Sequence, residues 1–566
     1  MDKGRTDRIT VMVKTYFYWL WKASYGIRWR MFLDCLLGLV RVASGLLFIY
    51  ISKLLVDMAT HSHHGSSESF YIYTVSLVLL LLVELSTNIF DSWFGSQTEI
   101  KMKNHIRHGL FVHLMTARWE GKDRLHSGDM MNRLEEDVRV VTNTICSSLP
   151  SLFVTGTQLV AAFLFLCSMN QALAWTLLLI MPVFLVFSKV YMKKMRRLTK
   201  DIRTTDSRVQ SLLQESLQHH VVIRSMERSH TMAAKLRTVQ QKLYQQIMYR
   251  TKFTLFSRSM VSIGFSVGYL VAFLWGIVSL RDGVISFGVM TAFLQLVSQI
   301  QRPMVDLSRQ IPSFIHASTS IDRLSELEAF PVEDTTDSRF LPGSVGIKIN
   351  NVTYRYPDGD HNILSDFSYD FEPGSRTAIV GETGVGKSTT IRLILALLQP
   401  LKGEIIFYNR AGQILSANAG SRCNIEYVPQ GNSLLSGSIR DNLLLGNPYA
   451  TDEEIRSVLH TAVADFVYSL PEELDTSCGE HGVGLSEGQA QRIAIARALL
   501  RPGNIMLFDE FSSSLDKETE QVMIERLLSE CKNKTMIFIT HREMIVKYCN
   551  GKVVLTAKNE EMTLDK

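Results

Sequence analysis

The sequence predicts two domains of different fold class, an all-α domain of six transmembrane helices followed by an α/β domain. Three observations lead to this expectation. At 566 residues, the chain is longer than one hydrophobic core usually supports. Nearly all long uncharged stretches lie before residue 302, whereas the later part mixes charged and apolar residues at the density of a globular protein. A glycine-rich loop near residue 381 separates a predicted strand from a predicted helix, which indicates an α/β domain.

The apolar stretches predict six helices that cross a membrane, since about 20 apolar residues span the hydrocarbon core. Residues 140–188 contain no charged side chain, so this stretch is predicted to fold back at the polar residues 168–171. A second short turn, at 281–283, separates two further apolar runs. The predicted spans are about 31–57, 70–97, 145–168, 172–190, 255–280 and 284–304.

Basic residues predict the orientation of these helices. Lysine and arginine are concentrated in the N-terminal arm and in segments 101–139 and 189–258, whereas the turns near 60, 170 and 282 contain only Arg281. Because basic loops stay on the cytoplasmic side, both termini and the α/β domain are predicted to face the cytoplasm of a multi-pass protein in the cell (inner) membrane. The net charge of +5 is not gathered into one basic block, which argues against nucleic-acid binding.

Charged residues inside the predicted spans require partners, because an isolated charge in lipid is costly. Asp34 and Arg41 lie in the first span and Glu84 in the second. Counted from the loop between these spans, Arg41 and Glu84 lie at similar depth, so an Arg41–Glu84 pair is predicted. The pair has two interpretations, a structural ion pair or a polar contact for cargo.

A phosphate-binding loop is the clearest chemical motif of the second domain. The glycines allow backbone N–H groups to surround phosphates at a helix N-terminus, Lys387 reaches the outer phosphates, and the Ser388 hydroxyl takes a place on Mg²⁺. The predicted strand 376–380 leads into this loop. The candidate nucleotide-binding residues are Gly381, Glu382, Thr383, Gly384, Val385, Gly386, Lys387, Ser388 and Thr389.

A second motif supplies two carboxylates. Residues 505–508 are apolar, as expected of a strand buried on both faces, and Asp509 and Glu510 follow directly. Asp509 is predicted to hold Mg²⁺, and Glu510 to take a proton from the attacking water.

A third motif, Leu485 to Gln489, opens a predicted helix, and Ser486 with Gln489 fits a helix-capping pattern. Together with the phosphate loop and the carboxylates, it resembles the signature of the ABC transporter family. The six predicted spans resemble the exporter type of that family. The resemblance covers the whole chain and implies an α/β P-loop NTPase domain of the ABC ATPase fold that binds ATP with Mg²⁺.

The resemblance also implies roles for further residues. Tyr356 would stack on adenine, and Gln430 would bind Mg²⁺ and water beside the membrane domain. Gln430 and His541 would act with Glu510 in catalysis. Ser486, Gly488 and Gln489 would bind nucleotide held by a second subunit, and Glu480 would lie in a loop between the two sites. Glu487 departs from the family pattern, in which glycine is commonest at this position. Because its carboxylate would approach the phosphates of the nucleotide, we expect a slower or partner-dependent ATPase.

The implied activity is that of an ATP-hydrolysing subunit that exports or flips a substrate by alternating access within a dimer, in contact with the lipid bilayer. A homodimer is favoured and a heterodimer stays open. Lipid, drug, peptide or a metal chelate all stay open as cargo. An ATP-gated channel, a regulatory subunit and an importer remain alternatives. The predicted boundaries are 1–325 for the membrane domain, 326–343 for a linker and 344–566 for the ATP-binding domain.

Overall fold

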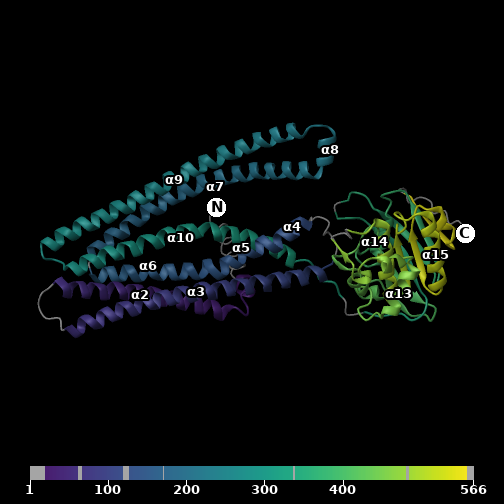
Figure 1. Ribbon diagram of the computed structural model, residues 1–566, viewed down its shortest axis with the longest axis horizontal. Coiled ribbons are helices and arrows are strands. Elements are labelled where there is room, and N and C mark those ends of the chain that lie inside the picture. The colour runs from purple at the N-terminus through teal and green to yellow at the C-terminus, as the bar shows by residue number, and fades with distance from the viewer. Residues whose placement is uncertain are drawn as a thin grey trace. The chain divides into compact units, whose positions relative to one another are not determined.

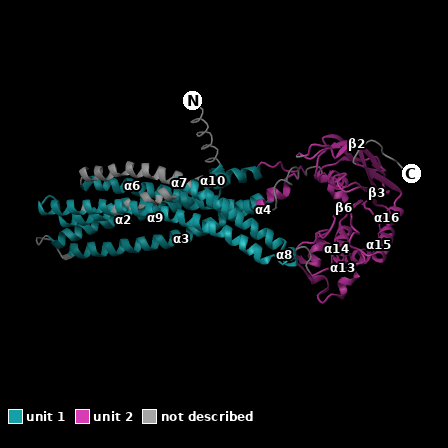
Figure 2. Cartoon of the chain, turned by 90° about the horizontal axis from the view of Figure 1, so that it is seen from above, with its two compact units in different colours: residues 1–111, 131–328 teal, residues 112–130, 329–566 magenta. Residues whose placement is uncertain are grey.

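The computed structural model describes residues 19–60, 67–118, 127–169, 171–334, 338–357, 359–479 and 484–556; for 171–193 and scattered positions elsewhere it describes the backbone only. The chain divides into two compact units (Figure 2). The first contains Met1–Phe111 and Met131–Glu328, and the second contains Val112–Met130 and Ala329–Lys566. The second unit therefore includes a segment that precedes much of the first unit in the sequence.

Long helices form the first unit (Figure 1). A continuous helical run from Ser127 to Met169 contains two short π-helical segments, η2 (Arg133–Asp137) and η3 (Thr144–Ser148), on either side of α5 (Val138–Asn143). The other helices are α2 (Arg28–Thr60), α3 (Ser67–Thr116), α4 (Ser127–Asn132), α6 (Leu149–Met169), α7 (Gln171–Gln218), α8 (His220–Ser225), α9 (Ser229–Arg281) and α10 (Phe287–Glu328).

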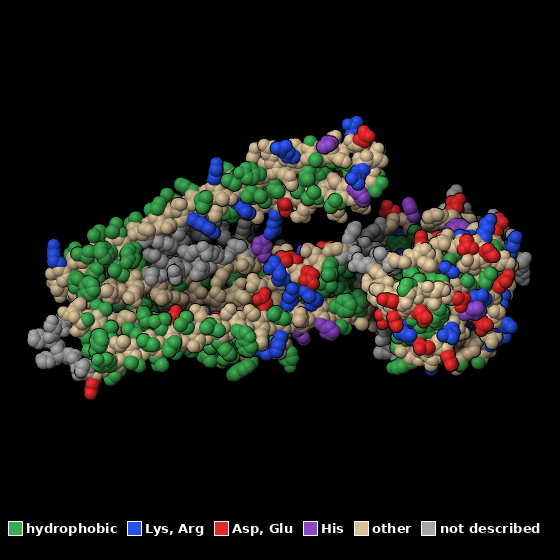
Figure 3. Space-filling model, in the orientation of Figure 1, with side chains coloured by type: hydrophobic (Ala, Val, Ile, Leu, Met, Phe, Trp, Pro, Cys, Tyr) green, Lys and Arg blue, Asp and Glu red, His purple; other side chains and the backbone are tan. Residues whose placement is uncertain are grey.

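Four helices of the described chain are long and apolar enough to cross a membrane, namely Arg28–Thr60, Glu68–Thr116, Gly128–Met169 and Ser229–Arg281. A shorter apolar helical stretch covers Phe287–Val297. The predicted span 172–190 lies in α7, where the side chains are outside the description. Hydrophobic side chains cover much of the helical surface in Figure 3, and the apolar window of α3 has 0% of its residues buried. Such extensive apolar exposure is typical of a lipid-facing surface.

Helices α2, α6 and α10 pack against one another around a shared apolar core. Ile49, Leu166 and Leu296 are among its buried members. Gly38 of α2 lies directly against Val154 of α6, where a side chain at position 38 would collide with the valine. Small residues of this kind let membrane helices approach closely. The polar side chains Gln158 and Gln299 form a hydrogen bond of 2.5 Å between α6 and α10.

The predicted pairing of Arg41 with Glu84 is wrong. Arg41 Nη1 lies 3.1 Å from Asp91 Oδ2 and 3.0 Å from Asn88 Oδ1, both two turns or less along α3 from the predicted partner. Side chains on a helix lean toward its N-terminus. In the antiparallel helices α2 and α3, Arg41 and Asp91 therefore lean toward each other, whereas Glu84 leans away. Counting residues from the loop ignored this tilt.

The second unit is an α/β domain with two sheets. A five-stranded parallel sheet has the order β11-β3-β10-β9-β6, and a four-stranded antiparallel sheet has the order β2-β1-β4-β5. The strands are β1 (Val345–Tyr354), β2 (Leu364–Phe371), β3 (Arg376–Gly381), β4 (Lys402–Asn409), β5 (Ile414–Ser416), β6 (Ile425–Val428), β9 (Ile505–Asp509), β10 (Thr535–Ile539), β11 (Gly551–Leu555) and the short pair β7 (Gly437–Ser438) and β8 (Ser477–Cys478).

The helices of this domain are α11 (Lys387–Ile394), α12 (Ile439–Leu444), α13 (Asp452–Thr461), α14 (Glu487–Leu500), α15 (Lys517–Glu530) and α16 (Glu543–Lys547), with short 3-10 turns η4 (Ala419–Asn424), η5 (Asp465–Ser469) and η6 (Glu473–Asp475).

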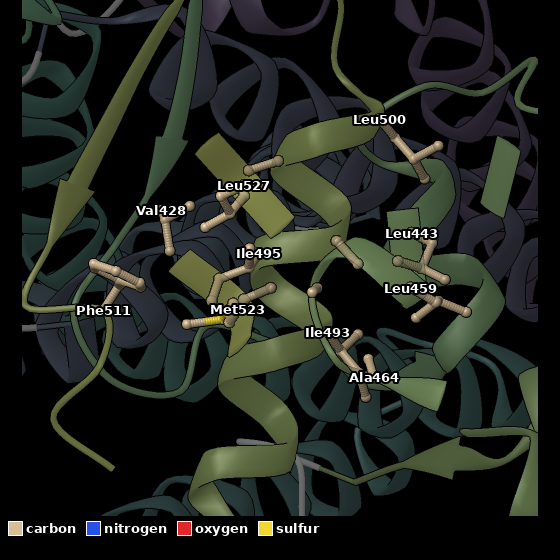
Figure 4. Packing of buried hydrophobic residues seen from close by; sticks show 14 of the residues in the cluster. Val428, Leu443, Leu459, Ala464, Ile493, Ile495, Leu500, Phe511, Met523 and Leu527 are labelled. Carbon is tan, nitrogen blue, oxygen red and sulfur yellow. The ribbon is translucent and has the colours of Figure 1, made fainter. Parts of the chain in front are cut away.

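The parallel sheet is covered on both faces, because alternate residues of its central strands enter different cores. Met506 and Phe508 of β9 pack with α14 and α15, in the cluster that Figure 4 shows around Ile495 and Met523. Leu507, between them, joins the other core, to which α11 and the antiparallel sheet contribute. All five residues of β9 are buried, including Asp509 at its end, and the apolar run 505–508 predicts this burial. The predicted fold class, a helical domain joined to an α/β domain, is confirmed.

Candidate active site

The phosphate loop joins β3 to α11 in a backbone conformation that needs glycine. Gly386 precedes α11 with φ of +104°, and a Cβ there would lie 2.8 Å from Ile363 Cγ2. A Cβ on Gly381 would collide with the carbonyl oxygen of Leu555. Both positions therefore exclude larger residues for steric reasons. The loop leads directly into the first turn of α11, where backbone N–H groups lack helical partners and can bind an anion.

Lys387, the first residue of α11, is buried and reaches back across the loop. Its Nζ donates to the Gly381 carbonyl oxygen at 2.6 Å and lies 3.4 Å from that of Glu382. His541 Nε2 lies 2.5 Å from the same ammonium group. A charged lysine can only donate, so this contact requires Nε2 to be the acceptor and the imidazole proton to sit on Nδ1. The loop thus holds one fixed positive charge near its centre.

Asp509 ends β9 and faces the first turn of α11. Its carboxylate is hydrogen-bonded to Ser388, and the residue is 5% exposed. Burial raises the pKa of Asp509, and the neighbouring Glu510 adds to this shift, while Arg392, Lys387 and Ser388 oppose it. A buried carboxylate beside a hydroxyl group supplies the hard oxygen ligands that Mg²⁺ prefers.

Glu510 is the first residue after β9. Its φ is +46°, and its N–H donates to the Ile539 carbonyl oxygen at 3.0 Å. Gln430 Nε2 donates to Glu510 Oε2 at 2.6 Å, and His541 Nε2 lies 3.6 Å from Glu510 Oε1. The three predicted catalytic residues therefore meet. They do so because β6, β9 and β10 are adjacent in the sheet and each residue follows the carboxyl end of its strand.

Tyr356 lies over the phosphate-loop helix. Its hydroxyl accepts a hydrogen bond from Arg392 Nη1 at 3.1 Å and lies 3.3 Å from Thr389 Oγ1. The sequence analysis did not identify Arg392. This residue donates a hydrogen bond to the Tyr356 hydroxyl, and its positive charge also lowers the pKa of Asp509. A signal was present, because Arg392 follows Ser388 by four residues and so shares its face of α11.

The signature residues form a helix cap. The Ser486 N–H donates to Gln489 Oε1 at 2.8 Å, and the Gln489 N–H donates to Ser486 Oγ at 3.2 Å. Within the described part of the chain, these hydrogen bonds join the two residues to each other and not to the phosphate loop. A Cβ on Gly488 would lie 2.8 Å from the Ser514 carbonyl oxygen, so this position also needs glycine. Glu487 is exposed, and Glu480 lies outside the described residues.

Two family models match the chain in the order in which its units occur. One, described as the ABC transporter transmembrane region, matches residues 31–304. The other, described as ABC transporter, matches residues 364–513. The chain belongs to the ABC transporter family. It is a membrane protein of the exporter type, in which ATP binding and hydrolysis by the α/β domain drive transport, and its cargo is unassigned.

Relatives and a solved structure agree with this membership. The transporter is 28% identical over 523 residues to ABC transporter B family member 1 of Dictyostelium discoideum, covering 91% of this chain and 57% of that protein. It is 26% identical over 570 residues to a Staphylococcus aureus protein named as a multidrug export ATP-binding/permease protein, covering 97% of each chain. A solved bacterial Atm1-family ABC exporter with ATP bound has the same fold, with a TM-score of 0.79, 21% identity and 95% coverage of each chain.

Proposed function

We propose that two copies of this transporter assemble into one exporter, and that each α/β domain hydrolyses ATP at the site built around Lys387, Glu510 and His541. The observation that carries the proposal is the direct contact among these groups and Gln430, which come from four separate segments of the chain. An ammonium, a carboxylate, an imidazole and an amide at one sheet edge are not required for packing of the hydrophobic core. Phosphoryl transfer can use each of these groups.

Each group has a chemical role in this proposal. Lys387 offsets the negative charge of the outer phosphates, and the loop from Gly381 to Thr389 surrounds them with N–H groups. Gln430 holds Glu510 Oε2, which leaves Oε1 to accept a proton as the water oxygen bonds to the γ-phosphorus and the bond to the leaving ADP oxygen breaks. His541 lies beside both Glu510 and Lys387. When Lys387 turns to the phosphates, Nε2 of His541 loses this donor, and a proton on Nε2 would let it position the attacked phosphate.

Mg²⁺ fits the oxygen donors at this place. The Ser388 and Asp509 side chains interact with each other, so a hydroxyl and a carboxylate oxygen lie side by side. We infer that Ser388, Asp509 and Gln430 would hold the ion, Asp509 through water. When bound, Mg²⁺ neutralises charge on the phosphates. Tyr356 would stack on the adenine, supported by Arg392 and Thr389.

The signature residues complete the site of the second subunit. Ser486 is exposed and Gln489 is half-exposed at the start of α14, and the side chain of each accepts a hydrogen bond from the N–H of the other. Among the described residues, the Glu487 and Gly488 N–H groups of the same turn have no such acceptor, so they are the groups that can bind an anion. In the dimer, Ser486, Gly488 and Gln489 would bind ATP held by the partner's phosphate loop. ATP binding then draws the two α/β domains together, and the helices change their access from one side of the membrane to the other.

ATP turnover by the purified chain in lipid vesicles tests this proposal. The expected result is cooperative turnover that falls by about 10² or more in Glu510→Gln. Glu518→Gln, which changes an exposed acid in the first turn of α15, is the matched control and should keep full turnover. Turnover that survives Glu510→Gln would remove Glu510 as the base. ATP binding without turnover by the unsubstituted chain would contradict an active homodimer, and would mean that a different partner subunit is required or that Glu487 has disabled the shared site.

Glu487 tunes the same interface in this proposal. Glu487 is the first residue of α14 and is exposed, so its carboxylate would approach the phosphates of the partner's nucleotide. Repulsion between like charges then weakens closure of the dimer. Glu487→Gly should raise turnover several-fold at low ATP concentration. Unchanged turnover and ATP affinity in this variant would contradict the role.

The α/β domain and both termini are proposed to lie in the cytoplasm, on the basis of the basic segments that flank the spans. Protease added outside intact cells should leave the α/β domain uncut, and should cut it in inverted membrane vesicles. Cleavage in intact cells would reverse the orientation.

A further inference from the structure

The end of α3 is paired with the segment that leads into the α/β domain. α3 ends at Thr116, and the Thr116 carbonyl oxygen accepts a hydrogen bond from the Glu333 N–H at 2.8 Å. The Arg118 N–H donates to the Pro331 carbonyl oxygen, also at 2.8 Å. Ala117 and Val332 between them form an antiparallel bridge. All of these residues belong to the second unit, so the last turn of this long helix is attached to the α/β domain.

The side chain of Glu333 extends this attachment inward. Its Oε2 and Oε1 accept hydrogen bonds from Arg422 Nη1 at 2.6 Å and from Arg422 Nη2 at 2.8 Å. The Glu333 and Arg422 side chains are only 16% and 25% exposed. Two parallel charge-assisted hydrogen bonds fix both the distance and the orientation of the pair. A single surface ion pair between flexible side chains would fix neither.

Arg422 connects this pair to the helix of the phosphate loop. Arg422 Nε donates to the Leu395 carbonyl oxygen at 2.7 Å, and Nη2 donates to that of Ala396 at 2.9 Å. These two residues directly follow α11, whose first residue is Lys387. Carbonyl groups at a helix C-terminus lack helical donors and carry the negative end of the helix dipole. The guanidinium satisfies both needs, so Arg422 is hydrogen-bonded to the end of α11 as well as to Glu333.

We propose that Arg422 and Glu333 are positioning residues that transmit the state of the phosphate loop to the end of α3. The path runs along α11 to the Leu395 and Ala396 carbonyls, through Arg422 and Glu333, and across the backbone bond to Thr116. It rests on the proposed function, because it assumes that nucleotide binds at Lys387 and displaces α11. Since a rigid helix of eight residues separates Arg422 from the phosphates, the pair acts on coupling and not on the chemical step.

Hydrogen exchange of the full-length transporter in lipid nanodiscs tests the path, with and without Mg²⁺ and an ATP analogue that has a non-hydrolysable β–γ bridge. In the unsubstituted chain, the analogue should slow exchange in 381–389 and change it in 112–118. In Glu333→Gln and Arg422→Lys, the change in 381–389 should persist while that in 112–118 falls by about tenfold, because charge-assisted hydrogen bonds contribute about this factor to local opening.

Two further variants keep the test decisive. Arg118→Pro deletes the N–H that donates to Pro331, lies beyond the end of α3, and should reduce the response of 112–118 as well. Asp452→Asn removes the shorter of the two ion pairs of Arg440, 2.5 Å long and elsewhere in the same domain, and should leave the response unchanged. If Arg422→Lys does not fold, the exchange response of 112–118 in Glu333→Gln and Arg118→Pro tests the path.

The failure of the path and the failure of the proposed function give different results. No slowing of exchange in 381–389 in the unsubstituted chain would overturn the proposed nucleotide site. Slowing there, with an undiminished response of 112–118 in Glu333→Gln and Arg118→Pro, would overturn the path through Arg422 and leave the nucleotide site standing.

Discussion

The phosphate loop of the α/β domain and the charged pair between α2 and α3 show how differently a sequence places polar side chains. In the loop, Lys387 and Ser388 lie on one turn of backbone, so their spacing in the sequence already fixes their arrangement. In the helix pair, Arg41 meets Asp91 across two separate helices, and a count along the chain selected Glu84 instead. Local geometry therefore makes a motif reliable, whereas pairing between helices depends on tilt and packing.

The largest expected effect is in the loop itself. Lys387→Met removes the only ammonium group that the described loop residues place among the predicted phosphate ligands, so ATP turnover should fall by about 10² or more. Lys402→Met, at an exposed position on β4, is the control and should change turnover less than about twofold. Turnover in purified chain with lipid is the measurement. A small effect of Lys387→Met would mean that the motif is less reliable than its geometry suggests.

Gly488 belongs to a motif of consecutive residues, but the contact that requires glycine there comes from Ser514, which is distant in the sequence. The Cβ of Gly488→Ala would approach the Ser514 carbonyl oxygen, so the start of α14 must shift. We expect turnover to fall by about tenfold, since a displacement near 1 Å disturbs a catalytic geometry. Binding of a fluorescent ATP analogue to the phosphate loop should stay unchanged. Gly109→Ala, on α3 with no atom within 4 Å of its Cβ, should leave both quantities unaffected.

The helix pair is tested by stability. Arg41→Met removes the cation that contacts Asp91 and Asn88, and should lower the free energy of unfolding by about 1–2 kcal/mol. Glu84→Gln should change it by less than about 0.5 kcal/mol. Thermal unfolding in nanodiscs should show a decrease in Tm of about 2–5 °C for the first variant only. Equal decreases in Tm for Arg41→Met and Glu84→Gln would indicate that Glu84 is a partner of Arg41 after all.

The smallest effect concerns a buried carboxylate in the α/β domain. Burial raises the pKa of Glu426 from its ordinary value of 4.5 to about 7, although Lys534 and the Gly503 N–H oppose this shift. Because the folded state binds the proton more tightly than the unfolded state, the stabilisation is present below pH 4.5 and is lost as the pH rises through about 7.

Glu426→Gln should abolish this dependence. The Tm of the unsubstituted chain relative to the variant should therefore be about 2–4 °C higher at pH 5.5 than at pH 7.5. A relative Tm that is the same at both pH values would show that the pair with Lys534 outweighs burial.

The sequence by itself determined the two-unit architecture and the local motifs. Uncharged runs of sufficient length have few alternatives to membrane helices, and the spacing of the glycines, Lys387 and Ser388 between a strand and a helix predicts a phosphate loop. The apolar run before Asp509 and Glu510 likewise predicted a strand buried on both faces. In each of these cases, the signal lies within one contiguous segment of the chain.

Only the tertiary structure decided which distant segments meet. The strand order brings Gln430, Glu510 and His541 together, and the contact with Ser514 explains Gly488. Pairing of 331–333 with the end of α3 attaches this helix to the α/β domain, although the two segments are far apart in the sequence. The physical reason is common to these cases. Side-chain tilt, strand order and close packing arise from the whole fold, and no periodicity or spacing along the chain encodes them.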